Sequence, residues 1–207
     1  MRFAAKIRGF QLTTRNVLQQ LERDYQISTL TAPELPVRTT YGPITGTPAK
    51  QTDIDHYVRL LADEFRLYPR KFISQVGLRS IALCTDLKFD GQSRTAVPDF
   101  EHQTLYLDVQ RGVPNTRYQR LAIHHDFFHM VDFSDDSLVE RDDRWSRLNK
   151  SGFRYGKGGK AAQSNPATAV LTTKHAGFLN HYSTTAVEED KAEVFAHLMV
   201  NAEYCRR

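Results

Sequence analysis

From residue 80 onward, the chain has short β-type runs first and then two long helical segments separated by a polar loop. The β-type runs lie at residues 80–89 (SIALCTDLKF) and 104–110 (TLYLDVQ), with turn residues between them. One helix is expected to begin after Asn115 and to run to about residue 131, and a second is expected over residues 187–201. Strands grouped ahead of helices, without regular alternation, predict an α+β fold.

The first fifty residues are expected to differ from the remainder. They contain an arm, a helix-like segment (NVLQQLERDYQ) and a stretch rich in proline, threonine and glycine at residues 30–48, which predicts an extended linker. A further helix is expected over residues 53–68, ending before a proline. We therefore predict an N-terminal part at residues 1–50 and one domain at residues 51–207, a length sufficient for a single hydrophobic core.

Composition excludes several classes of protein. No run approaches the roughly 18 apolar residues that a membrane span requires. Charges at Arg2, Lys6 and Arg8 interrupt the N-terminal segment, which argues against a cleavable signal peptide. Cys84 and Cys205 lie far apart, and Cys84 falls in an apolar run, so it is expected to be a core residue. These observations favour a cytoplasmic protein without a membrane partner.

The net charge of +4 is mild, and its clearest concentration is the sequence KSGFRYGKGGK. Lys150, Arg154, Lys157 and Lys160 lie among glycines there, and such a loop could contact nucleic acid or an acidic peptide. The glycine spacing is not that of a phosphate-binding loop. A solvated, flexible loop is the favoured interpretation, and nucleic acid is not an expected partner.

The sequence HHDFFHM at residues 124–130 carries the most specific chemistry. On a helix, positions i and i+4 share one face, so His125 and His129 can direct both imidazoles at one zinc ion. Asp126, the residue after the first of these histidines, then faces the water held at the metal; zinc peptidases place a glutamate there as the general base. His124 points away from the pair and is expected to be packed or to support the site from behind.

A third ligand is needed, and the residues alone leave three sources open. Asp132 or Asp135 follows the helix, but an aspartate stands at position 132 where one known pattern requires a glycine turn. His175 or His181 precedes the last helix. The remaining candidates lie at the acidic start of that helix, and they are Glu188, Glu189, Asp190 and Glu193.

The segment HYSTTAVEEDKAEVFA resembles the downstream motif of gluzincin-type zinc metallopeptidases, especially a broad group of predicted zinc-binding peptidases and the protease domain of anthrax lethal factor. In those families a tyrosine precedes a Glu-x-x-Ala-Glu sequence by seven residues, and Tyr182 stands in that relation to Glu189 here. The resemblance implies that Glu189 is the third zinc ligand. It also implies that Glu193 supports a ligand histidine and that Tyr182 stabilises the tetrahedral intermediate.

The same resemblance implies a zincin-like fold, in which a small mixed or antiparallel sheet packs on an active-site helix and a C-terminal ligand-bearing helix. Residues 104–110 resemble the edge strand along which zincins bind an extended peptide, which makes Tyr106 a candidate substrate-binding residue. The only tryptophan, Trp145, lies in the loop after the active-site helix. It is a second candidate for contacting the peptide or protein substrate, although the loop could equally pack onto the body.

Asp126 is the departure from the family pattern. Replacing Glu by Asp withdraws the carboxylate by about 1.5 Å, the length of one C–C bond, and misplacements near 1 Å can cost about a hundredfold in rate. The expected function is zinc-dependent peptide hydrolysis, attenuated by this change. The alternative is a catalytically inactive zincin-fold protein that binds a peptide or a partner protein.

Overall fold

The computed structural model describes residues 13–162 and 166–205; the predicted N-terminal arm, with Arg2, Lys6 and Arg8, lies outside the described residues. The helices are α1 (Thr14–Tyr25), α2 (Gln51–Phe65), α3 (Arg70–Val76), α4 (Thr116–Asp136), α5 (Asp143–Ser146), α6 (Gly159–Ala162) and α7 (Val187–Cys205), with 3-10 turns η1 (Pro166–Ala169) and η2 (Tyr182–Thr184). The strands are β1 (Ser28–Leu30), β2 (Val37–Thr39), β3 (Gly42–Pro48), β4 (Ser80–Phe89), β5 (Gln92–Ser93), β6 (Ala96–Asp99) and β7 (Thr104–Asp108).

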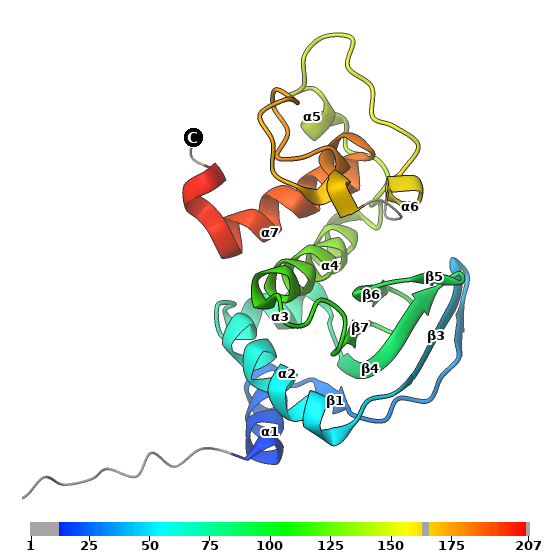
Figure 1. Ribbon diagram of the computed structural model, residues 1–207, viewed down its shortest axis with the longest axis vertical. Helices are drawn as coiled ribbons and strands as arrows, with labels where there is room; N and C mark the ends of the chain where they lie inside the picture. Colours follow the sequence, from blue (N-terminus) through cyan, green and yellow to red (C-terminus); the bar gives the residue numbers. More distant parts are fainter. Residues whose placement is uncertain (1–12, 163–165, 206–207) are drawn as a thin grey trace, which may run out of the picture.

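The strands form one mixed sheet in the order β2-β3-β4-β7-β6, with β1 and β5 also paired to β4. Strand β4 is parallel to β7, whereas β6 is antiparallel to β7. Helices α1 to α4 lie against one face of this sheet, and α7 lies beyond α4 (Figure 1). The predicted α+β class with a mixed sheet is therefore confirmed, although only α4 of the two expected helices packs on the sheet, and α7 packs on α4.

The expectation of an edge strand at residues 104–110 is wrong. Strand β7 is paired on both sides, because Leu107 lies opposite Leu83 of β4 and Tyr106 lies opposite Val97 of β6. The alternation along a strand places Tyr106 on the face away from the helices, where it is 4% exposed and packs in a second hydrophobic cluster. Tyr106 therefore faces away from α4, and β6 is the outer strand beside it.

The expected linker at residues 30–48 is also wrong, since β2 and β3 extend the sheet. Ile44 of β3 is fully buried opposite Phe89 of β4. Gly46 occurs where the register shifts between β3 and β4, and a Cβ atom there would lie only 3.1 Å from the Thr85 carbonyl oxygen. A glycine that signals a loop in the sequence thus marks a bulge where two backbones approach closely.

The main core joins both sides of the predicted boundary at residue 50. Helix α1 is capped by Thr13, whose hydroxyl accepts a hydrogen bond from the Asn16 amide, and it buries Val17 and Leu21. These side chains belong to the same cluster as Phe65 of α2 and as the inner residues of β4 and β7. The division of the chain at residue 50 remains a prediction of domain organisation, but one core spans it.

Helices α4 and α7 carry the candidate site and run close together above the sheet (Figure 1). Helix α4 begins after Asn115, whose side chain accepts a hydrogen bond from the Tyr118 amide, and it ends at Asp136, beyond the expected residue 131. Helix α7 begins at Val187 as expected and is interrupted at Asn201, where φ is −150°. Both predicted helices are confirmed, and each ends a few residues later than expected.

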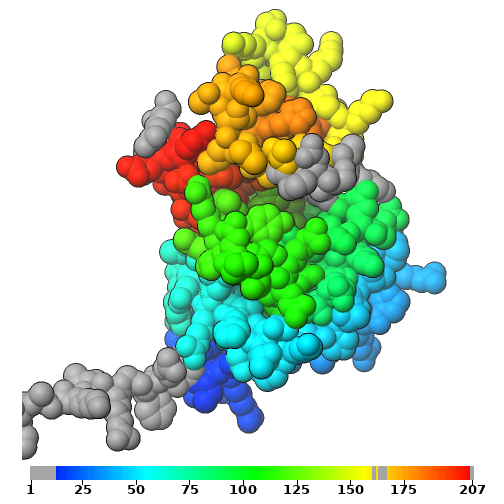
Figure 2. Space-filling view, in the orientation of Figure 1, coloured from blue at the N-terminus to red at the C-terminus, as the bar shows by residue number. Residues whose placement is uncertain are grey.

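The part of the chain that follows α4 lies on top of that helix. Figure 2 shows the yellow-to-red part of the chain stacked above the blue-to-green part that holds the sheet and helices α1 to α4.

Within the described ranges, no helix has both the length and the apolar character needed to cross a membrane.

Candidate metal centre

Helices α4 and α7 bring His125, His129 and Glu189 together. The Nε2 atom of His125 lies 2.9 Å from Oε2 of Glu189 and 3.2 Å from Nε2 of His129. The third separation, from His129 Nε2 to Glu189 Oε2, is 3.6 Å. Two imidazoles one turn apart on α4 thus converge with a carboxylate from the first turn of α7.

The donor set fits a zinc ion. Zinc binds imidazole nitrogen and carboxylate oxygen at about 2.0–2.2 Å, so ligand atoms at tetrahedral angles lie roughly 3.4 Å apart. The three observed separations, 2.9, 3.2 and 3.6 Å, lie around that value. Three protein ligands also leave a fourth position open, which is the arrangement of catalytic and not of structural zinc sites.

The charges of this cluster are strongly coupled. Burial opposes ionisation of Glu189, but hydrogen bonds from His125 and His129 outweigh it and hold the pKa of that carboxyl well below its usual range. Burial likewise opposes protonation of His125, but Glu189 and Glu193 raise its pKa well above the ordinary value. Without a metal, a proton on His125 therefore holds the two carboxylates together, and a divalent cation would take over that role.

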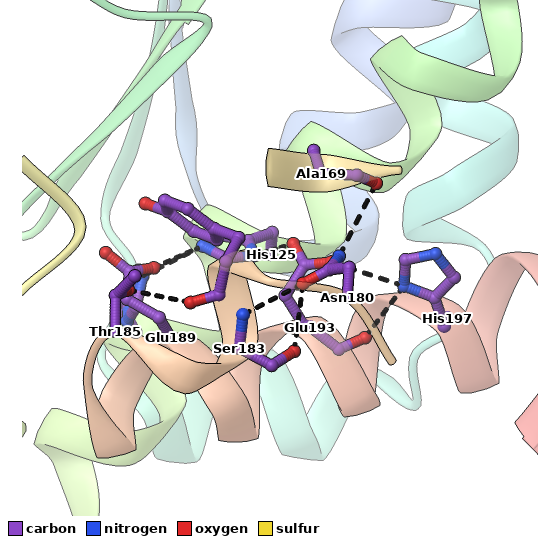
Figure 3. Close-up of polar contacts among 10 residues, drawn as sticks. His125, Ala169, Asn180, Ser183, Thr185, Glu189, Glu193 and His197 are labelled. Atoms are coloured by element: carbon purple, nitrogen blue, oxygen red, sulfur yellow. Dashed lines mark hydrogen bonds and ion pairs between the residues drawn. The ribbon is translucent and has the colours of Figure 1, made fainter. Parts of the chain in front are cut away.

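A second layer of residues orients His125 from behind (Figure 3). Oε1 of Glu193 lies 3.0 Å from Nδ1 of His125, on the opposite side of the ring from Glu189. The other oxygen, Oε2, accepts a hydrogen bond of 2.6 Å from Nδ2 of Asn180. The backbone carbonyl of Glu193 accepts one of 3.0 Å from Nδ1 of His197. This arrangement fixes the ring so that Nε2 points at the candidate site.

Sequence reasoning missed Asn180. This residue is fully buried, and its Oδ1 accepts a hydrogen bond of 2.8 Å from the Ser183 amide, so it also ties η2 to α7. The signal available in the sequence was its place in GFLNHY, just before Tyr182. An asparagine in a turn is ordinarily explained by its backbone geometry, which is why it carried no functional meaning there.

Asp126 lies beside the ligands and is half-buried. Burial raises the pKa of its carboxyl, whereas the neighbouring His125 and His129 act in the opposite direction. Arg94, from the connection between β5 and β6, also acts on it electrostatically. Sequence reasoning also missed Arg94, because nothing local connects residue 94 with residue 126.

Tyr182 and the glycine-rich loop close one side of the centre. The ring of Tyr182, which is 8% exposed, lies 5.9 Å from that of His125. Gly159 packs so closely that a Cβ atom there would lie 2.1 Å from Oε1 of Glu189 and 2.5 Å from the Tyr182 hydroxyl. The same loop is held to the segment before α7 by a hydrogen bond of 2.9 Å from the Gly158 amide to the Thr185 carbonyl. Only glycine fits at position 159.

The other candidate third ligands have different partners. Asp132 forms an ion pair of 2.5 Å with the buried Lys191. Asp190 accepts hydrogen bonds from Trp145 and Tyr155, at 2.8 and 2.7 Å. His175 and His181 lie against each other, with ring centroids 5.2 Å apart. In the part of the chain that the structure describes, the group with metal-ligand geometry contains Glu189 and none of these residues.

His124 is a packed residue, as its direction away from His125 and His129 on the helix predicted. Its ring is fully buried, with Nε2 2.8 Å from Oε2 of Glu64 and Nδ1 in contact with the Tyr68 hydroxyl. Glu64 also accepts a hydrogen bond of 2.6 Å from Nε of Arg120. This network joins α2 to the α4 segment that carries the ligands.

Trp145 serves the packing of the loop. Its indole N–H donates to Asp190, so the donor is directed at α7 and fixes the loop to that helix. Asp142 caps the N-terminus of α5, the short helix that contains Trp145, and its carboxylate lies 3.1 Å from the ammonium of Lys191. A direct role for Trp145 in substrate binding stays a prediction.

No protein-family model matches this chain, and no curated protein matches its sequence. Among solved structures, the chain resembles a protein from Bacteroides caccae described as a "putative zinc-binding metallo-peptidase". The TM-score is 0.56 at 14% sequence identity, and the alignment covers 99% of this chain and 78% of that one. At this identity the likeness shows a shared fold.

Proposed function

We propose that this protein is a zinc-dependent peptidase whose activity is attenuated by its short general base. The observation that carries the proposal is the convergence of His125 Nε2, His129 Nε2 and Glu189 Oε2 within zinc-ligand separation of one another. The shared fold with a protein described as a zinc-binding metallo-peptidase supports the same reading.

Each residue of the centre has a role in this proposal. His125, His129 and Glu189 would hold the ion, and zinc bound there would lower the pKa of a water toward about 7 and polarise a carbonyl. Asp126 accepts the proton from the attacking water. The Tyr182 hydroxyl donates a hydrogen bond to the oxyanion as it forms. Glu193 keeps Nδ1 of His125 as the hydrogen-bond donor, which leaves Nε2 free for the metal.

The peptide is proposed to lie along β6. Because β7 is paired on both sides, β6 (Ala96–Asp99) offers the outer edge at which an extended chain could add as a strand. Only alternate residues of an edge strand direct an N–H group outward, and Pro98 has no N–H group to offer. This edge replaces the 104–110 strand as the proposed binding surface.

The test measures zinc content and peptide hydrolysis together. Elemental mass spectrometry of the purified protein is expected to give about one zinc per chain, lost in Glu189→Ala and retained in the exposed-site control Glu203→Gln. Hydrolysis of a mixed peptide pool, followed by mass spectrometry, is expected to rise about a hundredfold in Asp126→Glu, which restores the longer base.

The outcomes separate the hypotheses. Absence of zinc in every form, even after zinc is supplied, would remove the proposal. Zinc binding without hydrolysis by either the natural protein or Asp126→Glu would instead leave a zincin-fold protein that binds a peptide or partner protein.

A further inference from the structure

The connection from α4 to α6 passes over the N-terminal half of α7 (Figure 1). We call residues 142–159 of this connection the strap. Two aromatic side chains of the strap reach the same atom of α7, because the Trp145 indole N–H and the Tyr155 hydroxyl donate to Oδ2 of Asp190, at 2.8 and 2.7 Å. Asp190 directly follows the candidate ligand Glu189, so these hydrogen bonds fix the strap beside the metal centre.

The C-terminal end of the strap lies on the metal centre itself. The Gly158 amide donates a hydrogen bond of 2.9 Å to the Thr185 carbonyl. At the next residue, a Cβ atom on Gly159 would lie 2.1 Å from Oε1 of Glu189 and 2.5 Å from the Tyr182 hydroxyl. One C–C bond adds about 1.5 Å, so the Cα atom of Gly159 lies within about 4 Å of both groups. The backbone of the strap therefore takes up space around the hydroxyl that is proposed to contact a bound peptide.

The strap adds little to the core that it covers. Within residues 142–159 only Gly159 is buried, and every other residue is half-buried or exposed. Phe153 packs on Phe178, with ring centroids 4.7 Å apart, outside the main core cluster. The carboxylate of Asp190 is 3% exposed, yet its Oδ1 has no hydrogen-bond partner within the described ranges. Segments that bury little apolar surface open at low free-energy cost, so the strap can leave the centre while the core stays folded.

The two ends of the strap are coupled. Trp145 lies near its beginning and Tyr155 near its end, and both depend on the one oxygen atom of Asp190. The side-chain amide of Asn149, between them, donates a hydrogen bond of 3.0 Å to the Tyr155 hydroxyl. Loss of one contact therefore weakens the others, and we expect the strap to dock and to leave as a unit.

We propose that the strap is an autoinhibitory element, which covers the metal centre in this structure and must be released before a peptide binds. This proposal rests on the proposed peptidase function and names a regulation of the same site. The apparent affinity for a ligand is then the intrinsic affinity multiplied by the fraction of molecules whose strap is released. Weakening the strap therefore tightens ligand binding, whereas weakening a loop that contacts the substrate would loosen it.

The test measures how tightly zinc-loaded protein binds a zinc-directed ligand, the 3-(hydroxycarbamoyl)propanoyl derivative of Leu-Ala amide, by titration calorimetry. Tyr155→Phe removes a hydrogen bond to the charged Asp190 and is expected to tighten binding about tenfold to a hundredfold. Gly159→Ala adds a Cβ atom that the docked strap cannot accommodate, and it is expected to act in the same direction. Arg154→Gln changes an exposed side chain next to Tyr155 and is expected to change nothing. Zinc content measured for each variant shows that the centre is intact.

A reversible cross-link tests the converse. A Cβ atom on Gly156 would lie 3.4 Å from the Cα atom of Thr185, so the two Cα atoms lie within about 5 Å of each other, a separation that a disulfide can span. Gly156→Cys combined with Thr185→Cys, in a Cys205→Ser background, is expected to lose hydroxamate binding when oxidised. Binding is expected to return after reduction with a phosphine, so the reduced protein is the matched control.

Trp145 reports the release of the strap directly, because it is the only tryptophan of the chain and its indole N–H bonds Asp190 in the docked state. Its fluorescence emission is expected to shift to longer wavelength when the hydroxamate binds to the natural protein, since the indole then enters water. The oxidised cross-linked protein is expected to show no shift.

The outcomes separate the two proposals. If neither Tyr155→Phe nor Gly159→Ala binds the hydroxamate more tightly than the natural protein, the strap proposal is overturned and the peptidase proposal stands. Binding to the oxidised cross-linked protein, or binding to the natural protein without a change in Trp145 emission, would also overturn the strap proposal alone. If no zinc-loaded form binds the hydroxamate, the open metal centre itself is wrong, and both proposals fail.

Discussion

Replacement of Glu193 by Gln tests whether the second layer of the centre supports metal binding. The change keeps the shape of the side chain and removes its charge. Oε1 of Glu193 lies 3.0 Å from Nδ1 of His125, and the side chain is only 12% exposed. The interaction is therefore a partly buried, charge-assisted hydrogen bond, not a surface ion pair.

The expected magnitude follows from this contact. A hydrogen bond to a charged group contributes about 1.5–3 kcal/mol, and loss of a group that supports a metal ligand typically costs about tenfold to a hundredfold in metal affinity. These ranges agree, because a factor of ten corresponds to about 1.4 kcal/mol. Zinc affinity in Glu193→Gln is thus expected to fall by one to two orders of magnitude.

The assay is a competition for zinc between the protein and a chromophoric chelator at fixed pH and ionic strength. Glu203→Gln, an exposed change on the same helix, is the matched control and is expected to bind zinc as the natural protein does. Circular dichroism of the metal-free variants reports whether α7 is preserved. Unchanged zinc affinity in a folded Glu193→Gln protein would refute the assigned role of Glu193.

Three further predictions follow from other parts of the structure. Gly159→Ala is expected to force the glycine-rich loop off the centre, because its Cβ would lie 2.1 Å from Glu189 Oε1. The packing of the loop on the centre is expected to weaken by about 1–3 kcal/mol. Zinc release to a chelator, which should be faster than in Gly156→Ala, checks this prediction. Glu64→Ala is expected to lower the free energy of unfolding of the metal-free protein in urea by about 3 kcal/mol, because it leaves buried partners unpaired; a loss below about 1 kcal/mol would contradict that. Zinc affinity is expected to fall by about tenfold per pH unit as the pH is lowered, and because the pKa of His125 is raised, the fall begins above its ordinary value of 6.5; titration of the affinity across this range measures it.

The sequence by itself determined the parts of this protein that depend on local geometry. The spacing of His125 and His129 directs both rings to one side of any helix that contains them, and Asn115 marks where that helix begins. Glu189 was one of several acidic candidates until the resemblance of its motif singled it out. The structure brings it within hydrogen-bonding distance of His125.

The tertiary structure decided everything that depends on which segments meet. Strand pairing joins residues distant in sequence, so the sequence alone placed Tyr106 on an edge and residues 30–48 in a linker, whereas both lie in the sheet. The same dependence on long-range contacts hid Arg94 and Asn180. The sequence specifies the chemical groups of each side chain. Which groups surround that side chain depends on the long-range contacts that form when the chain folds around a common core.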